Sequence, residues 1–197
     1  MSKAEKTKAF IIEKAAYTFN KKGYAGTSLN DLMEVTGLTK GALYGHFANK
    51  EAIAIEAYLY NVKELEKKLS NDISKQVLAK DKLIAFIDFY RFNWKTIFEW
   101  GGCPMLNAAI EADDNLPFLK KYIATSIKIW VKIIVRVIDS GKESKAFKQT
   151  INTQDYAYTI ATLVEGGIMM AKINNNKDLL VLALDRAVKI IEEEMVP

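Results

Sequence analysis

The sequence contains few residues that break helices and almost none that form covalent cross-links. Its 197 residues include three prolines and ten glycines, so long stretches can continue as helix. The single cysteine, Cys103, excludes an internal disulfide framework and a cysteine zinc cluster. One cysteine suits a reducing compartment. We expect no metal site and no cofactor.

The chain also lacks a long apolar run. No uncharged apolar segment approaches the length of a membrane span, and residues 1–8 are polar where a signal peptide would be apolar. Half of the residues are hydrophobic and 26% are charged, as in ordinary globular proteins. We therefore expect a cytoplasmic protein without a membrane partner.

Charge of one sign is concentrated at the N-terminal end. Residues 1–50 hold eight lysines and four acidic residues, a balance of +4 that equals the net charge of the whole chain. This asymmetry indicates an anionic partner for the first segment. The alternative is a solvated, lysine-rich helical surface.

Apolar residues recur at helical spacing along most of the chain. Thr27 or Ser28, Thr39 and Asn49 are expected helix caps, and Gly23, Gly37 and Gly141 are expected helix ends. The sequence thus predicts an all-α protein with a domain at 1–49, a second at 50–197, and a long helix that begins at the junction. The expected helices span about 3–22, 28–35, 39–47, 50–75, 81–100, 105–113, 116–140, 153–172 and 177–194.

Residues 27–47 have the pattern of a helix-turn-helix. A short helix leads to Gly37, which permits a tight turn, and a two-turn helix follows. Ala42, Leu43 and Phe47 are expected to face the interior, and Thr39, Lys40, Gly41, Tyr44 and Gly45 to face outward.

The outward residue types suit DNA. Thr39 and Lys40 can meet base edges, Lys40 can also meet phosphate, and Gly41 permits close backbone approach. Tyr44, His46 and Lys50 can donate to phosphate oxygens, and a helix N-terminus at Thr27 can bind phosphate. The threonines are equally suited to capping alone. The predicted DNA-binding residues are Thr27, Ser28, Thr39, Lys40, Gly41, Tyr44, His46 and Lys50.

The segment 11–53 resembles the DNA-binding domain of the TetR family of bacterial transcriptional regulators. Many relatives carry a large side chain where this chain has Gly45, so one contact of the usual set is missing. The matching residues are Ala15, Ala16, Phe19, Gly23, Tyr24, Thr27, Ser28, Leu32, Gly37, Lys40, Gly41, Leu43, Tyr44, His46, Phe47, Lys50 and Glu51.

The resemblance implies an all-helical C-terminal domain that dimerises and binds a small molecule. The last two expected helices carry broad apolar faces that could form a four-helix bundle between two subunits. The alternative is that these faces are core within one subunit. The faces comprise Ile160, Leu163, Val164 and Gly167 on one helix, and Leu180, Leu184, Ala187, Val188 and Ile191 on the other.

Large aromatic and flexible side chains in the middle helices could line the pocket of an apolar effector, although such residues are also typical of plain core. Asn107, Glu111 and Glu165 could supply polar groups. The candidate pocket residues are Trp94, Phe98, Trp100, Met105, Tyr122, Trp130 and Met169.

The sequence therefore predicts a homodimeric repressor of a palindromic operator, released by a small effector, and not an enzyme. Two alternatives stay open. One is a helical adaptor that binds protein through its last two helices. The other is an enzyme that uses Cys103 or the acidic group Glu111, Asp113 and Asp114; its weakness is that the only histidine lies 57 residues before the cysteine.

Overall fold

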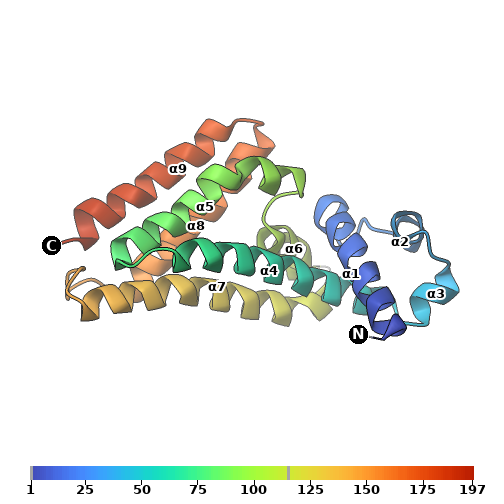
Figure 1. Cartoon of the computed structure of the whole chain (residues 1–197). Coiled ribbons are helices and arrows are strands. Elements are labelled where there is room, and N and C mark those ends of the chain that lie inside the picture. The colour runs from blue at the N-terminus through green and yellow to red at the C-terminus, as the bar shows by residue number, and fades with distance from the viewer. Residues whose placement is uncertain (1, 115) are drawn as a thin grey trace. The chain divides into compact units, whose positions relative to one another are not determined.

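The computed structural model describes residues 2–114 and 116–197, and these residues form helices without a strand. The all-α fold expected from the sequence is confirmed. In chain order the helices are α1 (Lys3–Lys22), α2 (Leu29–Thr36), α3 (Lys40–Tyr44), α4 (Lys50–Ser74), α5 (Ala79–Glu99), α6 (Pro104–Asp114), α7 (Pro117–Glu143), α8 (Thr153–Ile173), α9 (Lys177–Lys189) and the π-helix η1 (Ile190–Met195) (Figure 1).

Side-chain caps set the helix starts near the N-terminus. Ser28, and not Thr27, caps α2: its hydroxyl accepts the N–H of Asp31, whose carboxylate accepts the N–H of Ser28. The Thr39 hydroxyl accepts the N–H of Ala42 at the start of α3. The Asn49 side chain accepts the N–H of Ala52 at 2.8 Å in the first turn of α4. These caps explain why the helix starts expected from the sequence agree with the structure here.

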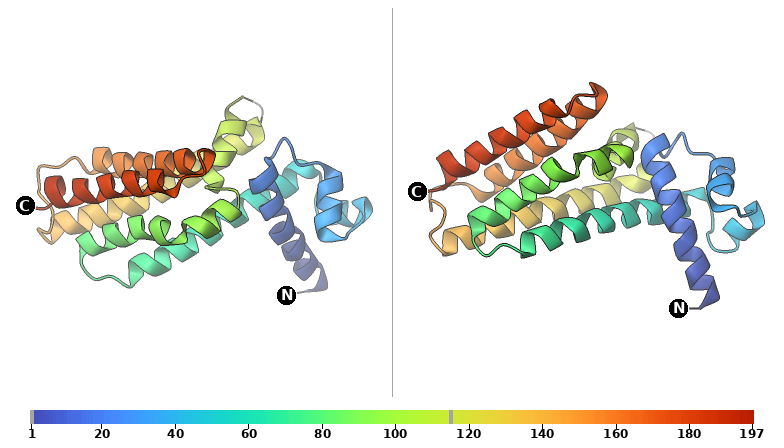
Figure 2. Two further views of the ribbon diagram at one scale, coloured as in Figure 1. Left: turned by 90° about the horizontal axis from the view of Figure 1, so that it is seen from above. Right: turned by 45° about the horizontal axis from the view of Figure 1, so that its top comes forward.

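The chain forms two compact units. Unit 1 contains residues 1–65 and 100–126, and unit 2 contains residues 66–99 and 127–197. Helices α4 and α7 contribute residues to both units. The helices α1–α3, called the head below, belong to unit 1 and are blue in both views of Figure 2.

The core of the head is built around aromatic rings. Phe19 stacks on Tyr24 with 5.2 Å between ring centroids, and Tyr24 meets Tyr58 of α4 edge-on at 6.4 Å. Leu32 and Leu43 complete this core without any exposed surface. Burial raises the pKa of Tyr24, so its hydroxyl stays neutral.

In unit 2, α8 and α9 pack on each other and α5 packs on both. A Cβ added at Gly167 would lie 2.9 Å from the Cβ of Ala183, so this glycine allows α8 and α9 to approach closely. A second cluster joins α5 to α7, where the indole N–H of Trp130 donates to the Tyr90 hydroxyl at 3.0 Å.

The prediction that Gly141 ends a helix is wrong. Gly141 lies inside α7, which continues to Glu143. A side chain at this position would overlap the buried ring of Phe147. The glycine is therefore a packing position on the helix surface and not a cap.

Most residues of the apolar faces that the sequence assigns to a dimer interface are buried within the single chain, and Leu163 and Val188 are half-buried. Ile160 and Val164 of α8, and Leu184 and Ile191 beyond them, have no exposed surface. The alternative, that these faces are core of one subunit, is thus correct for them. Different apolar residues of α8 and α9 are exposed, namely Tyr158, Met169, Met170, Ile173 and Leu182.

Within the described residues, no helix combines the length and the apolar character that crossing a membrane requires.

Candidate nucleic-acid interface

The turn between α2 and α3 sets the position of the short helix α3 within the head. Gly37 adopts a left-handed conformation with φ of 67°, and its N–H donates to the Met33 carbonyl at 2.9 Å. Leu43 and Phe47 are buried, so one side of the short helix packs inward. The opposite side is exposed, as the sequence predicts, and it carries Thr39, Lys40, Gly41, Tyr44 and Gly45.

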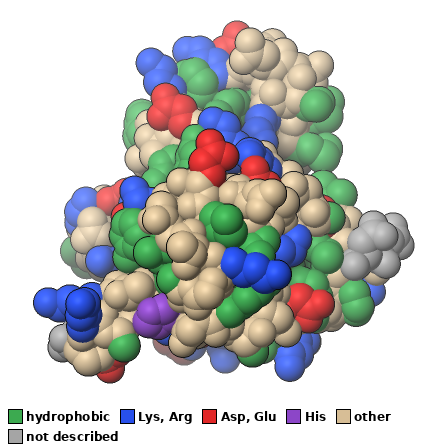
Figure 3. Space-filling view, turned by 90° about the vertical axis from the view of Figure 1, so that its right-hand side faces the viewer, with side chains coloured by type: hydrophobic (Ala, Val, Ile, Leu, Met, Phe, Trp, Pro, Cys, Tyr) green, Lys and Arg blue, Asp and Glu red, His purple; other side chains and the backbone are tan. Residues whose placement is uncertain are grey.

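The exposed face of α3 carries one cation and one phenol. The Lys40 ammonium lies 5.9 Å from the centroid of the Tyr44 ring, and 39% of Tyr44 is exposed. Gly45 has ordinary helical torsion angles, with φ of −69°, so no strained backbone requires glycine there. His46 is half-buried beside this face. In the view of Figure 3, basic side chains are dispersed among uncharged ones.

The two residues before α2 differ in accessibility. Thr27 is fully buried and its hydroxyl donates to the Gly23 carbonyl at 2.6 Å, whereas Ser28 is exposed. The Lys22 ammonium donates to the Asp31 carboxylate at 2.6 Å. Hydrogen bonds from Lys22 and Ser28 hold the pKa of Asp31 well below its usual range, so the carboxylate remains charged at the α2 N-terminus.

Lys50 is half-buried and supports the connection between α1 and α2. Its ammonium donates to the Thr27 carbonyl at 2.6 Å and lies 3.5 Å from the Tyr24 carbonyl. A lysine ammonium has three N–H donors. The predicted phosphate contact would use an N–H that does not donate to these carbonyls. The structure therefore gives Lys50 a positioning role in the head.

Helix α6 also makes hydrogen bonds to this connection. The Glu111 carboxylate accepts the N–H of Tyr24 at 3.0 Å and that of Ala25 at 2.8 Å. The Asn107 amide donates to the Gly101 carbonyl at 2.9 Å and to both oxygens of Asn20. The sequence suggests Asn107 and Glu111 as polar groups for a ligand. In the structure Asn107 is hydrogen-bonded to Asn20 near the end of α1, and Glu111 is hydrogen-bonded to the loop that follows α1.

The loop before α6 completes this contact. The Asn20 amide donates to the Trp100 carbonyl at 2.6 Å and to the Gly102 carbonyl at 3.2 Å. Gly101 has φ of 101°, and a Cβ there would lie 2.6 Å from the Asn20 carbonyl oxygen. We call Asn20, Asn107, Glu111 and the loop 100–102 the α6 clamp. Sequence reasoning missed it because its contacts with Asn20, Tyr24 and Ala25 join residues that lie 80 or more positions apart.

The candidate pocket residues fall in both units. Trp100, Met105 and Tyr122 belong to unit 1, and the other four to unit 2. Trp130 and Met105 are buried in cores, whereas 45% of Met169 is exposed. Two surface grooves of unit 2, of about 390 and 310 Å³, are lined by other residues. The effector pocket stays a prediction.

The residues of the enzyme alternative are engaged in packing and pairing. Cys103 is 2% exposed, and Asp113 forms an ion pair with Lys120 at 2.9 Å. Glu111 belongs to the α6 clamp, and the side chain of Asp114 lies outside the described residues. In the part of the chain that the structure describes, no three histidine, cysteine or acidic side chains gather as metal ligands would.

Comparison with known proteins agrees with this geometry. Residues 11–57 match the model for bacterial regulatory proteins of the tetR family, and residues 79–187 match the tetracyclin repressor-like C-terminal domain. The chain is 20% identical over 187 residues to the HTH-type transcriptional repressor DhaR of Mycobacterium sp. (strain GP1), covering 95% of this chain and 91% of that protein.

Two further proteins show how the similarity is distributed. Identity rises to 44% over 61 residues with the HTH-type transcriptional regulator TtgR of Pseudomonas putida, covering 31% of this chain and 29% of that protein. A crystal structure of a TetR-family transcriptional regulator from Cytophaga hutchinsonii superposes with a TM-score of 0.95 at 36% identity, covering 100% and 98% of the two chains. The chain therefore belongs to the TetR family of bacterial regulatory proteins and is a transcriptional regulator with a helix-turn-helix.

Proposed function

We propose that the protein is a homodimeric repressor that binds a palindromic operator through α3 and releases it when a small, mostly apolar effector binds. The observation that carries this proposal is the division of α3 into a buried side, with Leu43, and an exposed side, with Thr39, Lys40 and Tyr44. A recognition helix needs both: packing that fixes its position, and free side chains for the major groove.

The proposed contacts are Ser28, Thr39, Lys40, Gly41, Tyr44 and His46. Thr39 and Lys40 stand at the N-terminus of α3, the end that meets base edges in helix-turn-helix proteins. Tyr44 and His46 follow on the same exposed side and suit phosphate oxygens. Thr27 and Lys50 support the head through their bonds to the Gly23 and Thr27 carbonyls.

A palindromic operator requires two heads about 34–36 Å apart, and hence a dimer. The exposed apolar residues of α8 and α9 support an interface there. Ile173 is 81% exposed and Leu182 is 68% exposed, and contact with a second subunit would remove these aliphatic side chains from water. Met169 and Met170 extend the same set of exposed residues.

Effector binding would reach the head through helices shared by both units. Helix α4 follows the head directly and runs unbroken from Lys50 to Ser74. An effector that binds the DNA-free arrangement more tightly than the DNA-bound one shifts the population between them. Separate titrations of effector and operator should show the same coupling factor in both directions.

Lys40→Ala is expected to weaken operator binding about tenfold or more, because the substitution removes a phosphate or base contact from each subunit. The measurement is fluorescence anisotropy with DNA from upstream of the protein's own gene, at several salt concentrations. The slope of log affinity against log salt should fall by about one for each phosphate that the variant no longer neutralises. Lys128→Ala, which removes an exposed lysine from α7, is the matched control and should leave binding unchanged.

Equal, weak binding of all DNA sequences by the wild type and Lys40→Ala would contradict the regulator mechanism. That result would favour the adaptor alternative. An activity abolished by Cys103→Ser would favour the enzyme alternative.

Thr39→Ala is expected to relax sequence preference more than it lowers nonspecific affinity. Removal of a base contact costs about 1–3 kcal/mol of discrimination, so the ratio of specific to nonspecific affinity should fall roughly tenfold. Thr39→Ser keeps the capping hydroxyl and controls for helix stability. A drop in nonspecific affinity with an unchanged ratio would show that Thr39 touches the backbone of DNA and not its bases.

A further inference from the structure

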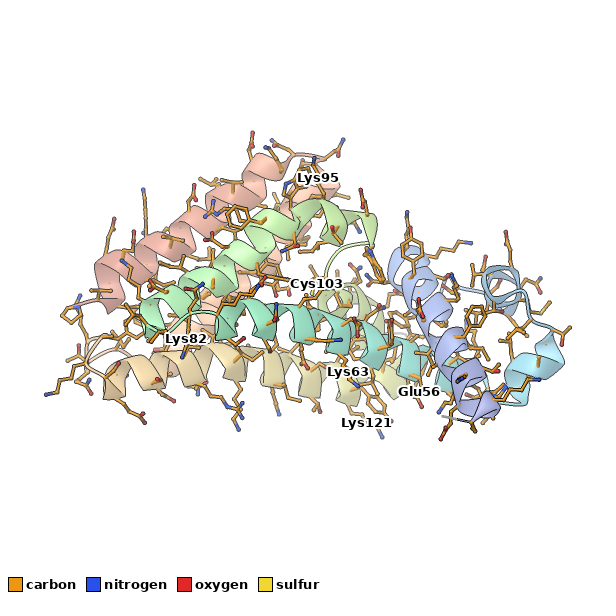
Figure 4. All side chains as sticks on the ribbon, viewed as in Figure 1. Glu56, Lys63, Lys82, Lys95, Cys103 and Lys121 are labelled. Carbon is orange, nitrogen blue, oxygen red and sulfur yellow. The ribbon has the colours of Figure 1, made fainter. Side chains whose placement is uncertain are left out.

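A groove in unit 2 combines two cations with an apolar floor. It has a volume of about 310 Å³ and lies among the end of α4, the start of α5 and the second half of α7. Figure 4 labels Lys82, which projects from the start of α5. The lining residues are Ser70, Ile73, Ser74, Lys82, Ile133, Arg136, Val137 and Ser140.

The two cations have no acidic partner within the described part of the chain. Among the residues that the structure describes, the side chains of Lys82 and Arg136 form no hydrogen bond or ion pair, and no lining residue is acidic. Two other cations of the same unit are paired: Lys80 with Glu192 at 3.0 Å, and Arg91 with Asp185 at 2.8 Å. The groove therefore has an uncompensated positive charge that attracts anions.

The floor of the groove is aliphatic. Ile73 is 8% exposed, and Ile133 and Val137 are half-buried. Serine hydroxyls stand at the rim, where Ser70 and Ser140 are exposed. The Ser74 hydroxyl donates to the Asn71 carbonyl at 2.9 Å, so its oxygen can still accept a hydrogen bond. Polar groups at the rim suit the charged end of a ligand, and the aliphatic side chains below suit an apolar body attached to it.

The other groove of unit 2 has the opposite charge. It measures about 390 Å³, and its lining includes Asp72, Asp81 and Asp88 with Lys75 as the only cation among the residues that line it. The two grooves differ in charge and share no lining residue. The same protein therefore offers one groove with acidic residues and one without, and a charged ligand can be compared at both.

We propose that the groove of Lys82 and Arg136 binds a small carboxylate with a short apolar body. The Arg136 guanidinium can donate two parallel N–H bonds to a carboxylate, and the Lys82 ammonium can add a third. The apolar body would lie on Ile73, Ile133 and Val137. Ligand pockets have volumes of about 300 to 1,000 Å³. The groove, at about 310 Å³, lies at the lower end of this range and suits a ligand with a short apolar body. None of the predicted effector-pocket residues lines this groove, and the inference is independent of DNA binding.

The test is a titration of the full-length protein with octanoate, followed by two-dimensional NMR of the backbone amides. Saturable shifts should concentrate at the groove-lining residues of α4, α5 and α7. Lys82→Gln/Arg136→Gln should weaken octanoate binding at least tenfold. Lys177→Gln removes an exposed charge elsewhere and should change nothing. Both groove substitutions are at or near the surface, so spectra away from the groove should show that the variant is folded.

Three results would overturn the proposal. The first is equal octanoate affinity in the double variant and the wild type. The second is equal binding of octyltrimethylammonium at the same residues, which would show that only the apolar body matters. The third is displacement of octanoate by inorganic phosphate at equal concentration, which would make the groove an oxyanion site without a role for its floor.

Discussion

Gly101→Ala is expected to lower the free energy of unfolding by about 3 kcal/mol or more. Its φ of 101° disfavours any residue with a side chain, at about 1–3 kcal/mol. The added Cβ would also lie 2.6 Å from the Asn20 carbonyl oxygen, a backbone atom that cannot rotate away. Relief of this overlap would separate the loop from α1 and stretch the hydrogen bonds of Asn20 and Asn107.

Urea unfolding measures this loss of stability, provided that the slope with denaturant stays that of the wild type. Gly166→Ala is the matched control. Gly166 lies in α8, and a Cβ there would meet nothing within 4 Å, so alanine should be neutral or stabilise by up to about 1 kcal/mol. A Gly101→Ala protein within about 0.5 kcal/mol of the wild type would mean that the α6 clamp contributes little to stability.

Leu43→Ala is expected to destabilise the protein by about 3 kcal/mol and to reduce DNA binding more than any single exposed substitution in α3. Leu43 is fully buried, and large-to-alanine substitutions in a core cost about 2–5 kcal/mol. It is the one buried residue within the five residues of α3, so its removal releases every proposed contact of that helix together.

Leu43→Met is the control, because it keeps an apolar side chain of similar volume at this position. Such a substitution lowers the free energy of unfolding by less than about 1.5 kcal/mol. The two readouts are urea unfolding and anisotropy with operator DNA below the temperature at which the variant unfolds. If folded Leu43→Ala binds DNA as tightly as the wild type, the position of α3 does not depend on this side chain.

Local signals account for the parts of the fold that the sequence predicts well. Helix α1 runs from Lys3 to Lys22 as expected, because Gly23 follows it and has positive φ. Ser28 and Thr39 set two further starts through bonds to residues three positions on. Such caps involve neighbours in the chain, so their effect can be recognised without a three-dimensional structure.

Contacts between distant residues explain the failures. Gly141 resembles a helix end by type, yet Phe147 occupies the space where its side chain would be. Leu180 and Leu184 have the apolar spacing of an interface, but α8 of the same chain already covers that face. Apolar periodicity shows that a face is buried and does not specify which helix buries it.

The candidate site divides in the same way. The exposed side of α3 follows from helix periodicity, so the sequence predicts correctly that Lys40 and Tyr44 lie on the surface. Residue type also leads to predicted DNA contacts for Thr27 and Lys50, but their side chains make hydrogen bonds to the Gly23 and Thr27 carbonyls within the head. The role of Glu111 has no local signal at all, because its partners are 86 and 87 residues away.

The α6 clamp determines where the chain can be cut for protein engineering. A chimera that joins this head to a relative's C-terminal region at residue 49 would lack Glu111, and the N–H groups of Tyr24 and Ala25 would be left without their acceptor. Residues 100–126 belong to the same compact unit as the head. A transplantable DNA-binding module should therefore be assembled from two separate stretches of sequence, with Asn107 and Glu111 carried along with α1.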